Sequence, residues 1–454
     1  MEELLSERLG SVSMKGAGAG KNRTLECGKN SVSGAVSQRA CVFCGARVVL
    51  NPVTDAFHLV HGPVGCASYT WDIRGSLSSG SELYRHSFTT DLQERDVVFG
   101  GLPKLEKALE RIVEKFHPPV VFIYSTCLVG VIGDDVDSVC RAAEKKHGVR
   151  VINVKAPGFA GHKAMGYRLA CEALMKILER DPRRTDKPVG INILGDYNLA
   201  GEMWIVKDYF RRIGVPVVSG FTGDSTYESI RRSTTAALNV VQCAGSMMYL
   251  ARLMEDKFDI PFIKASFFGL EDTKSALVHV SELLGDEETR RRAEELSTRG
   301  MEKAMRGISP YLPGLAGKKA AIFVGGGFKA VSLIRQFREL GMDTVMVGTQ
   351  TGQREDYELI ESLVNPGTVI LDDANPSELE TFMREKGADI LVGGVKERPL
   401  AYKLGVAFCD HNHERKIPLS GFDGAVNFAR EINLSVNSPV WEMARRTADP
   451  FLDA

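Results

Sequence analysis

Short runs of apolar and β-branched residues alternate with helical patterns along most of the chain. The helical patterns include residues 135–146 and 287–305, where apolar positions recur at helical spacing. The apolar runs are too short for helices and carry few polar side chains, so we predict that they form buried strands at 120–124, 151–154, 189–194, 238–241, 319–324, 344–347, 368–371 and 390–392. This alternation is typical of parallel sheets covered by helices, and the sequence therefore predicts an α/β fold.

Two segments interrupt this alternation: 181–188, which is rich in proline and charged residues, and 309–317, which is rich in proline and glycine. Such segments are typical of linkers. We therefore predict three Rossmann-like α/β domains with parallel sheets, at 41–186, 187–314 and 315–454. Residues 1–40 are rich in glycine, serine and lysine, and we interpret them as a flexible N-terminal arm or a strap across a partner. Ligands of parallel sheets bind at the carboxyl ends of strands, so we expect a site in the crevice between domains.

Composition excludes several classes of partner. The 454 residues include 57 basic and 58 acidic side chains, a balance that favours neither nucleic acid nor an anionic membrane surface. No apolar stretch is long enough to span a bilayer, and the first ten residues lack the apolar core of a signal peptide. Nine cysteines without regular spacing indicate a reduced cytoplasmic protein, whose cysteines are ligands or core residues rather than disulfides.

Three cysteines far apart in the sequence each lie where the chain is expected to turn. Cys41 opens the segment RACVFCGARVV, Cys66 ends HGPVGC and Cys127 ends the apolar run VVFIYSTC. The glycines and proline before Cys66 allow a tight turn whose backbone can approach an inorganic cluster. An Fe–S cluster usually takes four thiolates, so the fourth ligand would be Cys44 or a cysteine of another chain.

Two further cysteine settings remain open from the residues alone. Cys41 and Cys44 form a CxxC motif, which could be half of a zinc site, a redox pair or neither. The second CxxC of a zinc ribbon is missing, and the motif does not clearly follow a strand as a thioredoxin-type pair would. We therefore interpret Cys44 as a small buried residue. Cys243 follows the predicted strand 238–241 and opens a helical segment, where the helix dipole would stabilise a thiolate. From the residues alone, a core cysteine is the favoured interpretation at this position.

Two lysines and a histidine-containing segment are weaker signals. Lys329 follows the glycines 325–327, which lack the GxGxxG spacing of a dinucleotide site, and Lys396 follows the predicted strand 390–392. Either lysine could face an anionic ligand, but a lone lysine is usually a surface group. The segment DHNHER at 410–415 places two histidines two residues apart, a weak pattern for a metal site.

From about residue 39 to 441 the chain resembles the nitrogenase component 1 family, and most closely its cofactor-assembly members. The resemblance rests on long segments that occur in order, including FTTDLQERDVVFGG, VGTQTGQREDYELI and LSGFDGAVNFAREINLSVNSPVW, together with the cysteine segments. It implies three α/β domains and a homologous second subunit in a heterotetramer with two copies of each chain. It also implies that Cys41, Cys66 and Cys127 hold a [4Fe–4S] cluster at the subunit interface, with the fourth cysteine supplied by the partner.

The resemblance further implies a site for a precursor of the iron–molybdenum cofactor, associated with Cys243. The catalytic α subunit of nitrogenase shares all four cysteines, but caps the molybdenum with a histidine at a position that falls on Asn412 here, between His411 and His413. Lys163, Tyr167 and Lys329 replace other side chains near the catalytic cofactor, whereas Lys396 is shared and lies near homocitrate in that subunit. A carboxamide binds metal more weakly than an imidazole, which would favour release of a finished cofactor.

The resemblance therefore implies a cytoplasmic assembly scaffold rather than an oxidoreductase. Such a scaffold would hold an Fe–S precursor while molybdenum and homocitrate are inserted, before transfer to apo-nitrogenase. Its other partners would be the nitrogenase iron protein and a cluster-donating assembly protein. Three alternatives stay open: a catalytic α subunit of a nitrogenase or nitrogenase-like reductase, the scaffold of the vanadium system, and a cluster-free interaction subunit with buried cysteines.

Overall fold

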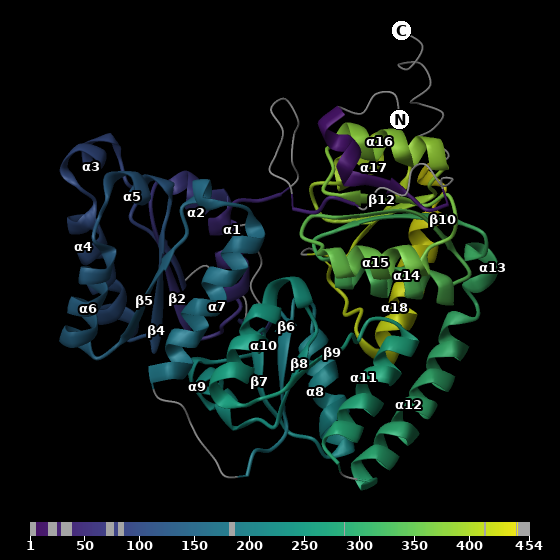
Figure 1. The fold of residues 1–454 in the computed structure, drawn as a ribbon, viewed down its shortest axis with the longest axis horizontal. Coiled ribbons are helices and arrows are strands. Elements are labelled where there is room, and N and C mark those ends of the chain that lie inside the picture. Colours follow the sequence, from purple (N-terminus) through teal and green to yellow (C-terminus); the bar gives the residue numbers. More distant parts are fainter. Residues whose placement is uncertain are drawn as a thin grey trace. The chain divides into compact units, whose positions relative to one another are not determined.

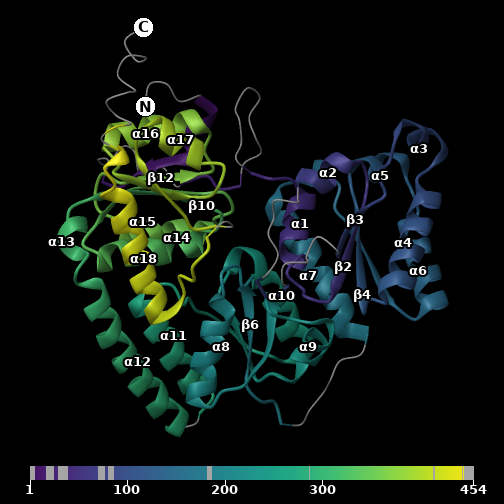
Figure 2. The same ribbon diagram turned by 180° about the vertical axis from the view of Figure 1, so that it is seen from behind.

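The chain forms two compact units, one of residues 40–264 and one of residues 1–39 together with 265–454 (Figures 1 and 2). The computed structural model describes residues 6–16, 25–28, 39–69, 77–79, 86–180, 187–285, 287–412, 415–441 and 443. The backbone crosses from one unit to the other at residues 39/40 and again at 264/265. Each unit is described by itself below.

The first sheet of the 40–264 unit is parallel, with the order β3-β2-β4-β5. Its strands are β2 (Ala56–His61), β3 (Ser87–Thr89), β4 (Val120–Ser125) and β5 (Arg150–Lys155). Side chains of β4 alternate between two cores, as the period of a strand requires. Val121 and Ile123 pack in the core that includes α4 (Leu102–Phe116) and α6 (Val136–His147), whereas Phe122 and Tyr124 pack in the one that includes α1 (Val42–Leu50) and α7 (Lys163–Arg180).

Helices α1 and α7 cross closely because each presents a glycine at the crossing. A Cβ on Gly45 would collide with the carbonyl oxygen of Lys163, and a Cβ on Gly166 would collide with that of Val42. Just before α1, Cys41 forms an antiparallel β-bridge with His162. The start of α1 is therefore fixed beside the start of α7.

A second parallel sheet completes this unit, with the order β7-β6-β8-β9. Its strands are β6 (Ile191–Asp196), β7 (Val217–Thr222), β8 (Leu238–Val241) and β9 (Phe262–Lys264), and its helices are α8 (Glu202–Ile213), α9 (Tyr227–Arg232) and α10 (Ala244–Phe258). One apolar core joins both sheets, since Leu194 of β6 and Met247 of α10 cluster with residues of α1 and α7.

The other unit contains one sheet with the order β1-β12-β11-β10-β13-β14. Five strands are parallel: β10 (Lys319–Val324), β11 (Asp343–Thr349), β12 (Val369–Asp372), β13 (Ile390–Gly393) and β14 (Ala407–Asp410). Helices α14 (Gly327–Glu339) and α15 (Arg354–Leu363) cover one face, and α16 (Pro376–Lys386) and α17 (Arg398–Lys403) cover the other (Figure 1). The strand order reverses between β10 and β13, which is where such sheets bind ligands.

The remaining elements complete the two units. Long helices α11 (Leu270–Leu283), α12 (Glu287–Ile308) and α18 (Gly421–Val436) pack on one another in the second unit. Short helices are α2 (Val64–Tyr69), α3 (Glu94–Phe99), α5 (Cys127–Ile132) and α13 (Leu312–Leu315), with 3-10 turns at Ser6–Ser11, Leu77–Ser79, Gly158–Ala160 and Ser233–Thr235. Within the described parts of the chain, no helix combines the length and the apolar character that crossing a membrane requires.

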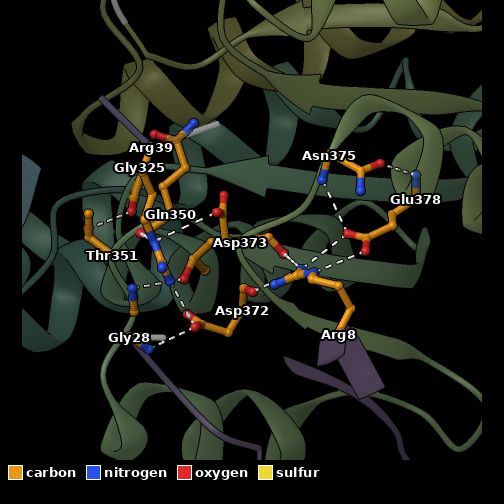
Figure 3. A network of polar contacts seen from close by, with 12 residues as sticks. Arg8, Gly28, Arg39, Gly325, Gln350, Thr351, Asp372, Asp373, Asn375 and Glu378 are labelled. Atoms are coloured by element: carbon orange, nitrogen blue, oxygen red, sulfur yellow. Dashed lines mark hydrogen bonds and ion pairs between the residues drawn. The ribbon is translucent and has the colours of Figure 1, made fainter. Parts of the chain in front are cut away.

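The prediction of a flexible arm at 1–40 is wrong for the parts that the structure describes. Strand β1 (Val12–Met14) pairs antiparallel with β12, and polar contacts extend this attachment (Figure 3). Arg8 donates to the carboxylate of Glu378 at 3.0 Å and to the carbonyl of Asp373 at 3.0 Å. Arg39 donates to the carboxylate of Asp372 at 2.8 Å. Strand pairing and buried charge pairs thus hold a segment whose apolar content is low.

All eight predicted strands overlap strands of the structure, but the predicted domain limits describe the sheets better than the units. Each predicted domain contains one sheet, yet α11 and α12, which fall within 187–314, belong to the same unit as the last sheet. Segment 309–317 lies inside that unit and includes α13, so it does not separate units. Of the other predicted linker, residues 181–186 lie outside the described residues.

Candidate cluster-binding site

The three predicted cluster cysteines lie at one edge of the first sheet, where β2, β4 and β5 end. Cys66 lies in α2, which follows β2, and Cys127 begins α5, which follows β4. Cys41 is brought to this edge by its bridge to His162, a few residues beyond the end of β5. Because parallel strands end at the same edge, segments far apart in sequence bring their thiols together there.

Gly158 borders two of these three thiols. Its backbone N–H donates to Cys127 Sγ at 2.9 Å. A Cβ added to Gly158 would lie 3.0 Å from Cys127 Sγ and 3.8 Å from Cys41 Sγ, so both sulfurs border the same glycine. Burial, followed by the neighbouring thiols of Cys127 and Cys41, raises the pKa of the Cys66 thiol. The three thiols therefore form one electrostatically coupled group, the cysteine edge.

The arrangement fits an Fe–S cluster better than a single metal ion. Nowhere in the described residues do three His, Cys, Asp or Glu side chains converge closely enough to hold one ion. A mononuclear zinc site would need that convergence. A cluster of several irons instead accepts thiolates spaced around it, and a backbone N–H such as that of Gly158 can donate to the sulfur of a ligand and tune its potential.

Apolar side chains surround the cysteine edge on the outside. Val64 and Tyr69 of α2, Val131 of α5 and Phe159 are each more than half exposed. Cys127 itself is exposed, and Cys41 and Cys66 are half-buried. Large apolar side chains exposed near one site commonly mark a protein interface. The cysteine edge thus lies on a surface suited to a second chain.

A buried histidine that the sequence analysis did not single out ties the cysteine loops together. His61 Nε2 lies 3.1 Å from a carboxylate oxygen of Asp134, and His61 Nδ1 lies 3.0 Å from Thr90 Oγ1. Thr126 Oγ1 donates to the carbonyl of His61 at 3.0 Å. Burial lowers the pKa of His61, although the bond to Asp134 partly opposes this. This network joins the turn before Cys66 to the residue before Cys127, and the histidine that opens HGPVGC was its sequence signal.

Cys243 occupies a separate position in the same unit, at the N-cap of α10. A Cβ on Gly195, in β6, would collide with the Cβ of Cys243, so the strand approaches this cysteine closely. Tyr167 and Tyr197 both interact electrostatically with Cys243, and Tyr197 donates to Ser246 Oγ at 2.6 Å. The predicted position of Cys243, after a strand and at the start of a helix, is confirmed.

Lys163 adds a positive charge to the surroundings of Cys243. Its Nζ lies 5.9 Å from the centre of the Tyr167 ring, and Tyr167 in turn interacts with Cys243. Burial lowers the pKa of Lys163, but the neighbouring Tyr167 and Cys44 outweigh it and raise this pKa above its ordinary value. Lys163 therefore stays protonated near neutral pH and can attract an anionic group.

The other predicted cofactor residues lie in the second unit, at the edge where β10, β13 and β14 end. Lys329 Nζ donates to the carbonyl of His411 at 3.2 Å. The Asn412 amide lies against Gly394, where a Cβ would come within 2.7 Å of its nitrogen. Lys396 is exposed in the adjoining turn, and burial raises the pKa of its neighbour Glu397 to about 7. That these residues and Cys243 contact one cofactor stays a prediction.

The comparison with known families decides the classification. The family model described as nitrogenase component 1 type oxidoreductase matches residues 41–437. The chain belongs to the nitrogenase component 1 family. Among solved structures, it is similar to nitrogenase Cp1 at pH 5, with a TM-score of 0.88, 29% identity and 97% of each chain covered.

Curated relatives within the nitrogenase component 1 family are more similar in sequence. The chain is 64% identical to the nitrogenase iron-molybdenum cofactor biosynthesis protein NifE of Clostridium pasteurianum, over 92% of this chain and 91% of that protein. It is 52% identical to the NifE protein of Methanosarcina barkeri, over 94% of both chains. The predicted family and its fold of parallel α/β sheets are thus confirmed.

The structure also bears on which residue lies where the resemblance places the molybdenum-capping histidine of the catalytic subunit. His411 is fully buried, with its ring 5.2 Å from Phe268 and 5.9 Å from Phe428. Burial, and then the charges of Lys329 and Arg415, hold the pKa of His411 well below its usual range. Asn412 is only partly buried. His411 is therefore a neutral core residue, which favours the register that places Asn412 at the edge, while His413 lies outside the described residues.

Proposed function

We propose that this chain is a scaffold on which the iron–molybdenum cofactor of nitrogenase is assembled. It would hold an Fe–S precursor while molybdenum and homocitrate are inserted, and then release the product to apo-nitrogenase. The observation that carries the proposal is that identity to proteins named for this biosynthesis reaches 64% and extends over 92% of the chain. The Nitrogenase Cp1 structures share the fold at much lower identity.

The cysteine edge is proposed to hold a [4Fe–4S] cluster shared with a second chain. Cys41, Cys66 and Cys127 supply three thiolates, and a NifN-type subunit would supply the fourth in a heterotetramer with two copies of each chain. Support comes from the exposure of Cys127 and the apolar side chains around it. When bound, such a cluster would relay electrons or brace the interface. Gly158 leaves room beside two of the sulfurs, as a bound inorganic group requires.

Cys243 is proposed to anchor the cofactor precursor, which is the cargo of the scaffold. Lys163 would attract the anionic cargo as a fixed charge, and Lys329 and Lys396 would do the same for the organic acid. Asn412 would be a weak metal ligand, because a carboxamide binds metal less firmly than the imidazole of the catalytic subunit. Weak capping suits a protein that must give up its product, so these residues support a scaffold rather than an oxidoreductase.

Other partners follow from the same role. We propose that the nitrogenase iron protein supplies electrons and that an assembly protein delivers the Fe–S precursor, all in the cytoplasm. The balanced charge of the chain, −1 at pH 7, gives no support to nucleic acid or membrane partners. On α3, Val98 and Phe99 are 75% and 86% exposed and offer apolar surface to a protein partner.

The test is anaerobic co-purification of the chain with a NifN-type subunit, followed by metal analysis and EPR. The wild type is expected to carry two kinds of cluster, and Cys243→Ala is expected to lose the cargo while keeping the [4Fe–4S] signal. Cys140→Ala, on the opposite face of the first sheet, is the matched control and should keep both. A wild type that carries mature cofactor and reduces acetylene with the iron protein would instead establish a catalytic α subunit. Incorporation of vanadium in place of molybdenum would assign the chain to the vanadium system.

A further inference from the structure

The structure places the CxxC motif in a different setting from the one the sequence suggested. Cys41 is the N-cap of α1 and itself forms the β-bridge to His162, and Cys44 lies in the first turn. The Gly45 N–H donates to the carbonyl of Cys41 at 3.1 Å, so this turn is closed. In a helical turn, Cα atoms three residues apart are roughly 5 Å apart. That separation falls within the range of about 4.4–6.8 Å that a disulfide bridges.

The surroundings of the two thiols differ in the manner of an attacking and a resolving cysteine. Cys41 is half-buried at the cysteine edge, whereas Cys44 is 7% exposed. Tyr69 interacts electrostatically with both thiols, so the two lie in one neighbourhood. Lys163 of α7 and Arg47 of α1 both interact with Cys44.

We propose that Cys41 and Cys44 form a reversible disulfide when the cysteine edge carries no cluster, so that cluster loading requires prior reduction of this bond. Both are reduced thiols in the structure. The loading step rests on the proposed function, because it needs Cys41 as a cluster ligand. Formation of the disulfide depends only on the position of the two thiols at the start of α1.

The oxidant is a low-molecular-weight disulfide and the reductant is a dithiol. The thiolate of Cys41 attacks one sulfur of the small disulfide, forming a mixed disulfide and releasing one small thiol. The thiolate of Cys44 then attacks Cys41 Sγ, which forms the protein disulfide and releases the second small thiol. The two protein thiols lose two electrons, the small disulfide gains them, and the two protons end on the two released thiols. A dithiol reverses both steps.

A competing disulfide between Cys41 and Cys127 is the main alternative, because both sulfurs border Gly158. Cys127 begins a different helix and already accepts a hydrogen bond from the Gly158 N–H. Cys44 is held at a fixed spacing from Cys41 by a single helical turn. Helix α1 therefore presents Cys44 to Cys41 without any movement between separate segments.

The experiment uses the full-length chain, freed of iron with a chelator under anaerobic conditions. It is equilibrated with graded ratios of oxidised to reduced glutathione, quenched with acid, alkylated and mapped by mass spectrometry of its peptides. The expected product is a Cys41–Cys44 disulfide, formed in one two-electron transition. Peptide maps dominated by a Cys41–Cys127 or Cys66–Cys127 link, or in which Cys44 is alkylated at every ratio, would overturn the proposal.

Two variants and a loading assay complete the test. In Cys44→Ala, glutathione should remain on Cys41 as a mixed disulfide, at least about tenfold more than in the wild type or the Cys140→Ala control. Mixed with its partner chain, oxidised wild type should take up a [4Fe–4S] cluster only after a dithiol is added. If oxidised and reduced wild type load equally, the gating role is wrong. If neither loads but the disulfide is mapped, the proposed cluster site fails and the disulfide stands.

Discussion

Two sheet edges in this protein share their topology and differ in what covers them. At the carboxyl ends of β2, β4 and β5, the side chains are thiols and the surface beyond them is exposed and apolar. At the carboxyl ends of β11 and β12, the acidic residues Asp372 and Asp373 are buried under the N-terminal segment by Arg8 and Arg39 (Figure 3). A parallel sheet provides the same kind of edge twice, and the side chains decide whether it binds a ligand or stabilises the fold.

The difference has an energetic consequence. An exposed thiol such as that of Cys127 contributes little to folding, because it buries little apolar surface. The Arg39–Asp372 pair is almost completely buried, with 6% and 1% of the two side chains exposed. Removing one partner from a buried pair leaves an uncompensated charge. Substitutions at the cysteine edge should thus change metal content. Substitutions at the edge where Arg8 and Arg39 bury Asp372 and Asp373, the covered edge, should change stability.

The largest effect is expected from Cys127→Ser. The variant should lose the [4Fe–4S] cluster completely when purified with its partner chain, since a hydroxyl is a poor substitute for a thiolate ligand. Its metal-free form should unfold within about 0.5 kcal/mol of the wild type, as expected for an exposed site. Iron content and urea unfolding measure the two quantities, and Cys140→Ser provides the control for metal content. If the variant kept its full iron content, Cys127 would not be a cluster ligand. The contrast between the cysteine edge and the covered edge would then fail.

Arg39→Ala should have the opposite profile. It leaves the Asp372 carboxylate buried, with Tyr357 Oη at 2.7 Å and the Gly28 N–H at 2.8 Å as partial compensation. We expect a loss of about 3 kcal/mol in the free energy of unfolding of this unit. Arg354→Ala, which breaks an exposed pair with Glu358, is the control and should lose less than about 1 kcal/mol. Equal losses in the two variants would show that the covered edge does not depend on its buried charges.

The sequence was sufficient for the general architecture and for the thiols, but not for the covered edge. Buried parallel strands such as β4 are continuous apolar runs, so they were predictable. Strand β1 was missed because Val12–Met14 contains one serine and lies in a polar segment, where only pairing with β12 makes it a strand. The partners of Arg8 and Arg39 are more than 300 positions away in the sequence. No local pattern indicates such contacts. The contact between His61 and Asp134 was unpredictable for the same reason, because the two residues meet only in the folded protein.

Gly158→Ala tests how closely the cysteine edge is shaped for its ligand. The new Cβ would lie 3.0 Å from Cys127 Sγ, so the sulfur or the backbone must shift. Overpacking of this kind costs about 1–3 kcal/mol. We expect a cluster that is lost roughly tenfold faster to a chelator, in accordance with about 1.4 kcal/mol per factor of ten. Gly65→Ala, with no neighbour within 4 Å of the added Cβ, should match the wild type. Equal rates of cluster loss in Gly158→Ala and the wild type would mean that the cysteine edge accommodates the added Cβ without strain.

The smallest expected effect is a pH dependence of stability that arises from one buried histidine in each unit, His58 and His411. His58 lies in β2, with Nδ1 2.9 Å from Tyr124 Oη. Burial, followed by the charges of Arg47 and His86, holds its pKa well below the usual range. The folded form keeps His58 neutral while the unfolded form binds a proton below about pH 6.5. Stability contributed by neutral His58 is therefore complete above that pH and is lost as the pH falls, by at most about 1.4 kcal/mol per pH unit.

Hydrogen exchange of backbone amides, corrected for the intrinsic effect of pH, can follow the two units separately. In the wild type, protection of β2 and β4 should fall below pH 6.5 along with that of β13 and β14, where His411 is also buried and has a lowered pKa. His58→Gln should weaken the dependence in β2 and β4, where His61 keeps its own lowered pKa, and leave β13 and β14 unchanged, so that the second unit is an internal control. If both regions flatten together, the two units unfold as one, and the comparison between their edges would have to be made within a single cooperative structure.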